Sequence, residues 1–313
     1  MDYRTSSRER RRSWYGLKRH VKQFLSRRIP HFGLRVAARL FPSLRTGRLP
    51  APARLTEVRG RIQGEHFVML RPDRCVVAKE LYWGQGSRPK PEDNMAVQVF
   101  ASLARRSDIT IDIGAYTGIF TLVATAVNGS LRAHAFEIVP DVYEALRENC
   151  LRNGVLDRVV LHNEGIGNPE TYIMIPPASG GSALPDFYSS RLRFQDGAVI
   201  PFRSLDSLVA LMPPGGNVLV KVDVEGTEND VFRFGQRFLS SFLPDILCEV
   251  LPEVATPAEL EALLAPHGYH FYLVKGTGLQ RYAHIHAAAR FRDWFFTIKE
   301  PEQLRRAGLS GLA

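Results

Sequence analysis

Cysteine is scarce in this chain of 313 residues, because Cys75, Cys150 and Cys248 stand far apart and form no CxxC pair. A disulfide framework and a cysteine zinc site are both disfavoured, and we expect a reducing compartment, the cytoplasm. Long apolar runs are also missing: no stretch reaches the roughly 18–20 residues of a membrane-spanning helix, which excludes an integral membrane protein. The content of 45% hydrophobic and 23% charged residues fits a globular chain with a sizeable core.

Acidic residues are scarce at the start of the chain. Residues 1–61 contain 17 Lys and Arg but only 3 Asp and Glu, a net charge of +14, whereas residues 62–313 have a net charge of −5. We therefore divide the chain into a basic N-terminal extension, 1–61, and a mildly acidic domain, 62–313, that begins with a lead-in segment, 62–107. A basic extension of this kind is typical of a segment that contacts an anionic surface or an acidic partner.

Apolar residues of the extension recur at helical spacing, at Trp14, Leu17, Val21, Phe24 and Leu25. We expect this basic helix to end at Pro30, and a second apolar and basic stretch follows at 32–41. The sequence allows four roles for residues 1–41. They could contact an anionic membrane peripherally, dock on an acidic partner, pack on the rest of the chain, or act as a mitochondrial transit peptide.

The body alternates between short apolar strands and helices of ordinary length. The predicted strands are 109–113, 131–138, 159–166, 218–224, 246–250, 269–274 and 294–299. The predicted helices between them are 117–127, 141–153, 228–238 and 257–265. The lead-in is predicted to hold strands at 66–70 and 74–83 and a helix at 94–105. This order predicts an α/β fold with a parallel sheet covered on both faces, and ligands bound at the carboxyl ends of its strands.

A glycine turn joins the strand at 109–113 to the next helix. Gly114 and Gly118 give a GxxxG spacing, which differs from the GxGxxG of dinucleotide-binding turns. Asp112 at the strand end would repel a phosphate, so a phosphate-free, cationic cofactor such as S-adenosylmethionine fits better. A tight turn before a packed helix is the alternative explanation.

The next two strand ends extend the same pattern. Glu137 follows Gly114 by 23 residues, a distance at which an acid can accept hydrogen bonds from both ribose hydroxyls of an adenosine cofactor. A solvent-exposed Glu before a turn is the alternative. Asn163 lies at the end of the third strand, among small residues, where an adenine ring is expected. Together the three strand ends predict a binding site for an adenosine cofactor.

Charged residues stand at the end of an otherwise valine-rich strand, at Lys221, Asp223 and Glu225. Alternation in a strand places all three on one face, and buried charges of this kind are costly unless they are paired. We therefore predict that these residues are catalytic: the Lys orients a hydroxyl group and a carboxylate takes its proton. The alternative is a Mg²⁺ site formed by Asp223, Glu225 and Glu249.

With these residues identified, the chain from about Thr110 to Val250 resembles the FkbM family of class I S-adenosylmethionine-dependent methyltransferases. The matching segments are 111–118, 135–137, 205–208 and 221–228. The resemblance implies a Rossmann-like, seven-stranded, mostly parallel sheet with the last strand antiparallel. It also implies O-methylation of a hydroxyl on a glycan, glycolipid or natural product.

The resemblance also assigns residues. By position it implies that Asp112, Gly114, Gly118 and Glu137 contact the cofactor, and we include Ala115, Tyr116 and Asn163 as cofactor-binding candidates. Tyr116 stands where the family often has Asn, and Ile138 stands where it usually has Pro. Neither difference removes a charge that the cofactor needs.

Two other enzyme classes compete with this interpretation. An NAD-dependent oxidoreductase would explain the fold but conflicts with Asp112 and the GxxxG spacing. A nucleic-acid methyltransferase would explain the basic extension, but the body is acidic and has no NPPY-like tetrapeptide. The acceptor is not readable from the sequence, although an insertion at 168–200 supplies candidates for contacting it: Tyr172, Phe187, Tyr188, Arg191 and Phe194.

Overall fold

The computed structural model describes residues 21–22, 24–40, 49–176, 196–252, 256–306 and 308–309. Its helices are α2 (Arg28–Leu40), α3 (Val76–Trp83), α4 (Pro91–Ala104), α5 (Ile119–Val127), α6 (Pro140–Arg152), α7 (Glu228–Arg233), α8 (Gln236–Phe242), α9 (Pro257–Leu264), α10 (Pro301–Arg306) and the 3₁₀ helices η2 (Leu205–Leu211) and η3 (Ala265–His267). Its strands are β1 (Glu57–Ile62), β2 (Glu65–Leu70), β3 (Ile109–Ile113), β4 (Arg132–Phe136), β5 (Val159–His162), β6 (Gly165–Ile166), β7 (Tyr172–Ile175), β8 (Ala198–Arg203), β9 (Val218–Val222), β10 (Asp245–Glu249), β11 (His270–Lys275), β12 (Gly278–Tyr282) and β13 (Asp293–Thr297).

The main sheet, built from the described residues, has the strand order β12-β11-β13-β10-β9-β3-β4-β5. Strands β5, β4, β3, β9 and β10 pair in parallel, and β13 is antiparallel to both of its neighbours, β10 and β11. The α/β class and the antiparallel last strand are confirmed. The predicted count of seven strands is wrong, because β12 folds back on β11 as a hairpin and adds an eighth strand at the edge.

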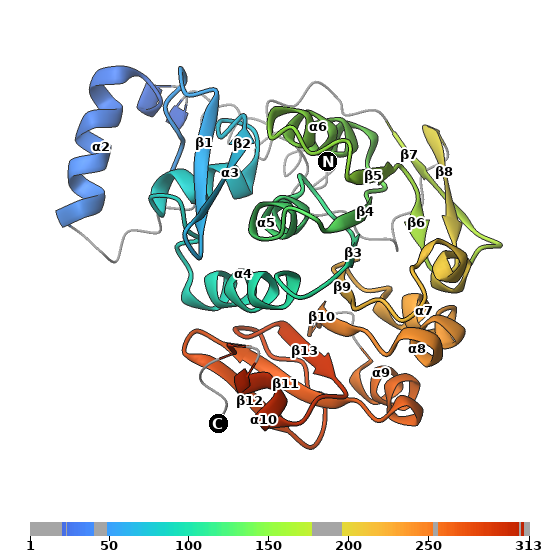
Figure 1. Ribbon diagram of the computed structural model, residues 1–313. Coiled ribbons are helices and arrows are strands. Elements are labelled where there is room, and N and C mark those ends of the chain that lie inside the picture. Colours follow the sequence, from blue (N-terminus) through green and yellow to red (C-terminus); the bar gives the residue numbers. More distant parts are fainter. Residues whose placement is uncertain are drawn as a thin grey trace, which may run out of the picture.

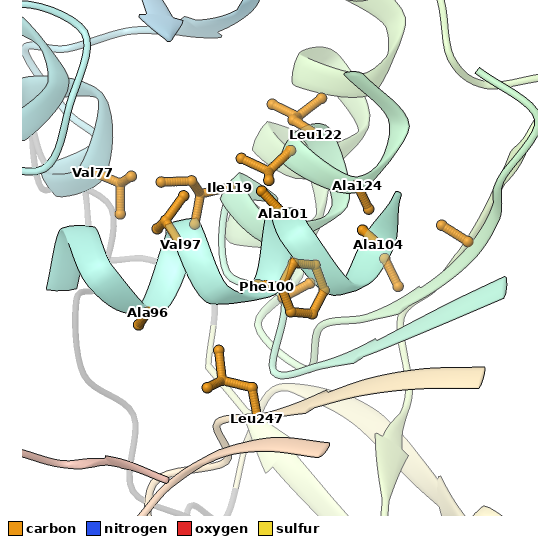
Figure 2. Packing of buried hydrophobic residues seen from close by; sticks show 14 of the residues in the cluster. Val77, Ala96, Val97, Phe100, Ala101, Ala104, Ile119, Leu122, Ala124 and Leu247 are labelled. Carbon is orange, nitrogen blue, oxygen red and sulfur yellow. The ribbon is translucent and has the colours of Figure 1, made fainter. Parts of the chain in front are cut away.

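Helices cover both faces of this sheet. Val218, Val220 and Val222 of β9 pack in the core shared with α7, α8 and α9, whereas Leu219 packs in the core shared with α4, α5 and α6. Figure 2 shows the core on the side of α4, α5 and α6, where Phe100 of helix α4 lies between helix α5 and strand β10. Because side chains alternate along a strand, Lys221 lies on the same face of β9 as Leu219, the face covered by α4, α5 and α6.

The lead-in segment differs from its prediction. Strands β1 and β2 form an antiparallel hairpin, and β1 runs across the expected boundary between residues 61 and 62. The stretch 74–83 is mainly the helix α3 and not a strand. The Sγ atom of Cys75 accepts a hydrogen bond from Ala78 N and caps this helix, which buries one face against the core. The β-branched and aromatic residues of this stretch misled the prediction.

Three further elements depart from the sequence-based boundaries. The predicted strand 159–166 is divided into β5 and β6, which belong to different sheets, and the predicted helix 228–238 is divided into α7 and α8. Pro30 lies in the first turn of α2, where its missing N–H costs nothing, so the helix begins around it. Within the described residues, no helix has both the length and the apolarity needed to cross a bilayer.

Candidate active site

The glycine turn after β3 packs directly against the end of β9. Gly114 has φ +79°, and a Cβ atom there would lie 1.8 Å from the backbone oxygen of Asp223. Its N–H donates to Phe136 O at 3.0 Å, and Asp223 N donates to Ile113 O at 2.9 Å. Only glycine fits this left-handed and crowded position, so the turn and the end of β9 are held together.

Asp112 lies under the turn and does not line a cavity in the described structure. Its side chain is completely buried, and its Oδ2 accepts hydrogen bonds from Thr121 N at 3.1 Å and Thr121 Oγ1 at 2.7 Å. Asp112 thus accepts a hydrogen bond from an N–H in the first turn of α5. Its negative charge also interacts favourably with the positive N-terminal end of that helix. Burial raises the pKa of Asp112 to about 6, although Thr121 and Lys221 act in the opposite direction.

Gly118 is likewise placed away from the cavity walls. It precedes α5 with φ +91°, and a Cβ atom there would meet Leu146 of helix α6 at 2.4 Å. Its lack of a side chain lets α5 and α6 pack closely. The structure therefore gives Asp112 and Gly118 supporting positions, while Gly114, Ala115 and Tyr116 line a cavity directly.

Glu137 lies at the end of β4 and lines the same cavity. Its Oε2 accepts from Tyr116 N at 2.9 Å, and its Oε1 accepts from Val139 N at 2.8 Å, so the carboxylate ties the glycine turn to the loop after β4. Burial raises its pKa to about 7. Each oxygen keeps a second lone pair that can accept a ribose hydroxyl.

The third strand end contributes through its backbone and its neighbours. Asn163 donates from Nδ2 to Glu137 O at 2.7 Å and does not line the cavity. The wall is formed instead by Gly165 and Ile166, with Phe136 and Phe202 nearby. A Cβ atom on Gly165 would lie 2.4 Å from the Phe202 ring, so this apolar slot needs a glycine. Its flat aromatic walls suit an adenine ring.

Lys221 is buried at the carboxyl edge of the sheet, with 1% of its side chain exposed. Its Nζ lies 3.4 Å from Asp223 Oδ2, 3.6 Å from Asp293 Oδ1 and 5.2 Å from the centroid of the Phe120 ring. Burial alone would lower the pKa of this ammonium, but the facing carboxylates of Asp223, Asp293 and Glu249 raise it. The Lys therefore remains a fixed positive charge beneath a group of acids.

The acids above this lysine meet as the sequence predicts. Asp223, Glu225 and Glu249 each bring a carboxylate oxygen within 4.8 Å of the other two. Burial, together with the charges of Asp223 and Asp293, raises the pKa of Glu249 well above its ordinary value, which favours the protonated form and a hydrogen bond to Asp223. Burial and the charge of Asp223 raise the pKa of Glu225 to about 7.

This carboxylate cluster has the dimensions of a hard-cation site, as the Mg²⁺ alternative requires. The Lys221 ammonium already supplies a positive charge to Asp223, and the proton on Glu249 removes one negative charge. Both features reduce the charge that a divalent ion would neutralise. The cluster thus fits two roles: its charges suit holding a proton, and its spacing suits a hard divalent cation.

Two cavities meet at this cluster. The first has a volume of about 270 Å³ and extends from the apolar slot past Glu137 and the glycine turn. The second, of about 450 Å³, opens on the other side. Their linings share four residues: Arg88, Phe120, Asp223 and Glu249. A group bound in one cavity is thus separated from a group in the other only by these side chains.

Sequence reasoning missed part of this shared wall. Arg88, between α3 and α4, is held by Glu80 at 2.6 Å and by Asp93 at 3.1 Å. Phe120 is the second residue of α5, and Asp293 enters from β13, whose register places it opposite Glu249. None of them belongs to a motif near the cluster in sequence. Only the position of Asp293 at a strand end was a usable signal.

The insertion after the third strand is partly described. Strands β7 and β8 pair antiparallel within it, and β8 also pairs with β6. Tyr172 on β7 is exposed and lines neither cavity. The other proposed acceptor contacts, Phe187, Tyr188, Arg191 and Phe194, lie outside the described residues, as do Trp14 and Leu17 of the extension.

The sheet order, with its antiparallel β13, and the glycine turn after β3 are those of a class I methyltransferase type of α/β domain. The family model "Methyltransferase FkbM domain" matches residues 112–271, which is half of the chain. The chain therefore belongs to the FkbM methyltransferase family and carries the domain of an S-adenosylmethionine-dependent methyltransferase. The family named from the sequence is confirmed.

Solved structures show a weaker likeness. The FkbM methyltransferase of Methylobacillus flagellatus KT is 17% identical, with a TM-score of 0.41, and the match covers 61% of this chain and 44% of that chain. The TYW2 protein of M. jannaschii in complex with AdoMet is 15% identical, with a TM-score of 0.38, covering 78% and 85%. The match thus spans less than half of the Methylobacillus protein. No curated protein matches this chain significantly.

Proposed function

We propose that this protein methylates a hydroxyl oxygen of a polar acceptor, such as a glycan, a glycolipid or a hydroxylated natural product. The observation that carries the proposal is the wall shared by the two cavities. Asp223 and Glu249 line both cavities, which supports a reaction between a cofactor bound in one and an acceptor bound in the other. When bound, S-adenosylmethionine supplies an electrophilic methyl group.

The first cavity fits that cofactor. Gly114 provides the close backbone approach, Glu137 offers acceptors to the ribose hydroxyls, and the Phe136 and Phe202 rings enclose an apolar slot. Carboxylates near the junction complement a sulfonium and an amino group, and the described lining of this cavity has no cluster of cations that would hold a phosphate. The same features disfavour a dinucleotide cofactor.

The second cavity favours a polar acceptor. Nine of its twelve described lining residues are charged: Glu92, Asp93, Asp223, Glu249, Asp293, Arg88, Lys90, Arg290 and Arg292. Five acids stand against four bases there, with Lys221 beneath them, so the wall is close to neutral in total. Such a wall offers many donors and acceptors to a compound rich in hydroxyls.

Three side chains at the junction have different roles in removing the proton from the acceptor hydroxyl. Asp223 accepts the proton of the acceptor hydroxyl as that oxygen forms its bond to the methyl carbon. Lys221, whose Nζ lies 3.4 Å from Asp223 Oδ2, holds this carboxylate in place. Glu249, whose protonated form is favoured by burial and by the charge of Asp223, donates a hydrogen bond to Asp223 and fixes its orientation. Positioning of the oxygen supplies most of the remaining rate enhancement.

The test is transfer of a labelled methyl group to a panel of acceptors: neutral oligosaccharides, lipid-linked sugars, phosphorylated sugars and RNA. We expect label in a product that resists mild alkali, since methyl ethers are stable there and methyl esters are not. Asp223→Asn should abolish the signal on the same acceptor. Labelling confined to RNA or to an amine would contradict the proposal.

A further inference from the structure

Helix α2 carries a row of exposed apolar side chains. Phe32, Val36 and Leu40 follow one another at spacings of four, with 70%, 41% and 68% of each side chain exposed. Val21 and Phe24, just before the helix, are exposed as well. The described residues contain thirteen large hydrophobic side chains that are exposed, and five of them lie in residues 21–40. This concentration marks an interaction surface, because such side chains are otherwise scattered singly.

The opposite side of α2 is attached to the rest of the protein. His31 is buried, its Nε2 lies 2.8 Å from Tyr82 Oη, and its ring centroid lies 5.4 Å from that of Trp83. Ala53 N donates to Ser26 O at 3.0 Å just before the helix. Figure 1 shows α2 at the edge of the molecule, beyond β1, β2 and α3. The apolar row therefore faces away from the domain.

The segment that carries this row is basic. Residues 21–40 contain no Asp or Glu and five basic residues: Lys22, Arg27, Arg28, Arg35 and Arg39. The side chains of Lys22, Arg27 and Arg35 are exposed. An apolar row bordered by cations along one helix is the pattern of a helix that lies in a membrane interface.

Charge also discriminates among the possible occupants. A dimer that paired α2 with α2 across a twofold axis would bring two basic faces together, and the two extensions would repel each other. Residues 1–20 contain seven Lys and Arg against two acids, so they too are repelled by this surface. An exposed apolar row bordered by basic residues suits the fluid interface of an anionic bilayer.

We propose that α2, with residues 21–25 before it, is a docking surface for an anionic lipid bilayer. Phe32, Val36 and Leu40 would enter the acyl boundary, while Arg35 and its basic neighbours contact the lipid phosphates. Helix α3 joins this surface to the first cavity, since Tyr82 and Trp83 hold α2 and Val76 and Val77 line the cavity wall. The proposal concerns binding and does not depend on the methyl-transfer chemistry.

The test is flotation of the full-length protein with vesicles of phosphatidylcholine, with or without about one third phosphatidylglycerol, in about 0.05 M salt. We expect binding to the anionic vesicles and little binding to the neutral ones. The double variant Phe32→Ser and Leu40→Ser should reduce the partition coefficient about tenfold or more. Raising the salt to about 0.5 M should weaken wild-type binding to a similar extent.

A matched control makes the same change at exposed apolar positions elsewhere. Leu151 on α6 and Val199 on β8 are 60% and 59% exposed, so Leu151→Ser with Val199→Ser should bind vesicles like the wild type. Thermal unfolding and cofactor affinity verify that both double variants are folded. The proposal is overturned if the wild type ignores anionic vesicles, if both double variants lose binding equally, or if Phe32→Ser with Leu40→Ser instead dissociates a dimer without changing vesicle binding.

Discussion

Glu137 accepts hydrogen bonds from two backbone N–H groups and is expected to accept others from the ribose hydroxyls. Replacing it by Gln should affect both roles in measurably different ways. The side chain keeps its shape, but one of its two oxygens becomes an NH₂ group. That group cannot accept both the hydrogen bond from Tyr116 N or Val139 N and one from a ribose hydroxyl. We therefore expect weaker cofactor binding together with a change in stability that depends on pH.

The magnitudes follow from the two backbone contacts and from burial. Hydrogen bonds to a charged acceptor contribute about 1.5–3 kcal/mol each, so losing one of them weakens cofactor binding by roughly ten- to a few hundred-fold. Leaving one buried N–H without an acceptor costs about 1–3 kcal/mol of stability. Against this, a pKa raised by burial from 4.5 to about 7 means that ionised Glu137 destabilises the fold by about 3 kcal/mol at pH 8.

The sign of the pH dependence follows from that raised pKa. Glu137 contributes its stabilisation fully below pH 4.5 and loses it as the pH rises through about 7, whereas Gln does not titrate. The variant should therefore be less stable than the wild type near pH 5 and equal or more stable near pH 8. The difference between the two proteins should shift by about 2–3 kcal/mol across that range.

Two measurements test this reasoning. Calorimetric titration at pH 8 gives the cofactor affinity, and urea unfolding of the cofactor-free proteins at pH 5 and pH 8 gives the stability difference. Glu164→Gln is the matched control, because Glu164 lines the same cavity but its carboxylate lies 3.6 Å from Arg203. Unchanged cofactor affinity in Glu137→Gln would refute the role of Glu137 at the ribose. If the stability difference between wild type and variant is the same at pH 5 and pH 8, the raised pKa of Glu137 is refuted.

Four further results are expected. Asp223→Asn should lower kcat by about 10²-fold or more with little change in cofactor affinity, and equal losses in both would remove Asp223 from the proton step. Gly114→Ala should cost about 3 kcal/mol or more, because its Cβ would lie 1.8 Å from a backbone oxygen; wild-type thermal unfolding would contradict this. Wild-type cofactor affinity should fall by up to about tenfold per pH unit below about pH 7, as measured by titration, since protonated Glu137 must ionise. EDTA should leave turnover unchanged, and activity that is lost and then restored by Mg²⁺ would establish Asp223, Glu225 and Glu249 as metal ligands.

The sheet and the cofactor side of the site were predictable because local sequence determines them. Short runs made mostly of β-branched residues, such as 109–113 and 218–222, have few alternatives to a buried parallel strand. A ligand site then follows at their carboxyl ends, and Gly114, Glu137 and Asp223 do line the cavities there. The same reasoning could not tell that Asp112 caps α5, because that depends on which face of β3 the helix covers.

The acceptor side was not predictable from local pattern. Arg88 and Asp293 lie more than 60 residues from the Lys221 motif in either direction, and only the folded chain brings them to Asp223 and Glu249. The error at 74–83 has a similar origin. Its valines and aromatic residues favour a strand locally, but packing against the core and the Cys75 cap favour a helix. Tertiary contacts outweigh local preference at these places.

The wall of Arg88, Phe120, Asp223 and Glu249 has a consequence for inhibitor design. Because both cavities open on these four side chains, one molecule could join an adenosine unit to a hydroxyl-rich unit through a short linker. Binding of the first half would raise the effective concentration of the second to about millimolar or more, without any new contact. Such a bisubstrate ligand would also rank candidate acceptors, since only the correct second unit would improve its affinity.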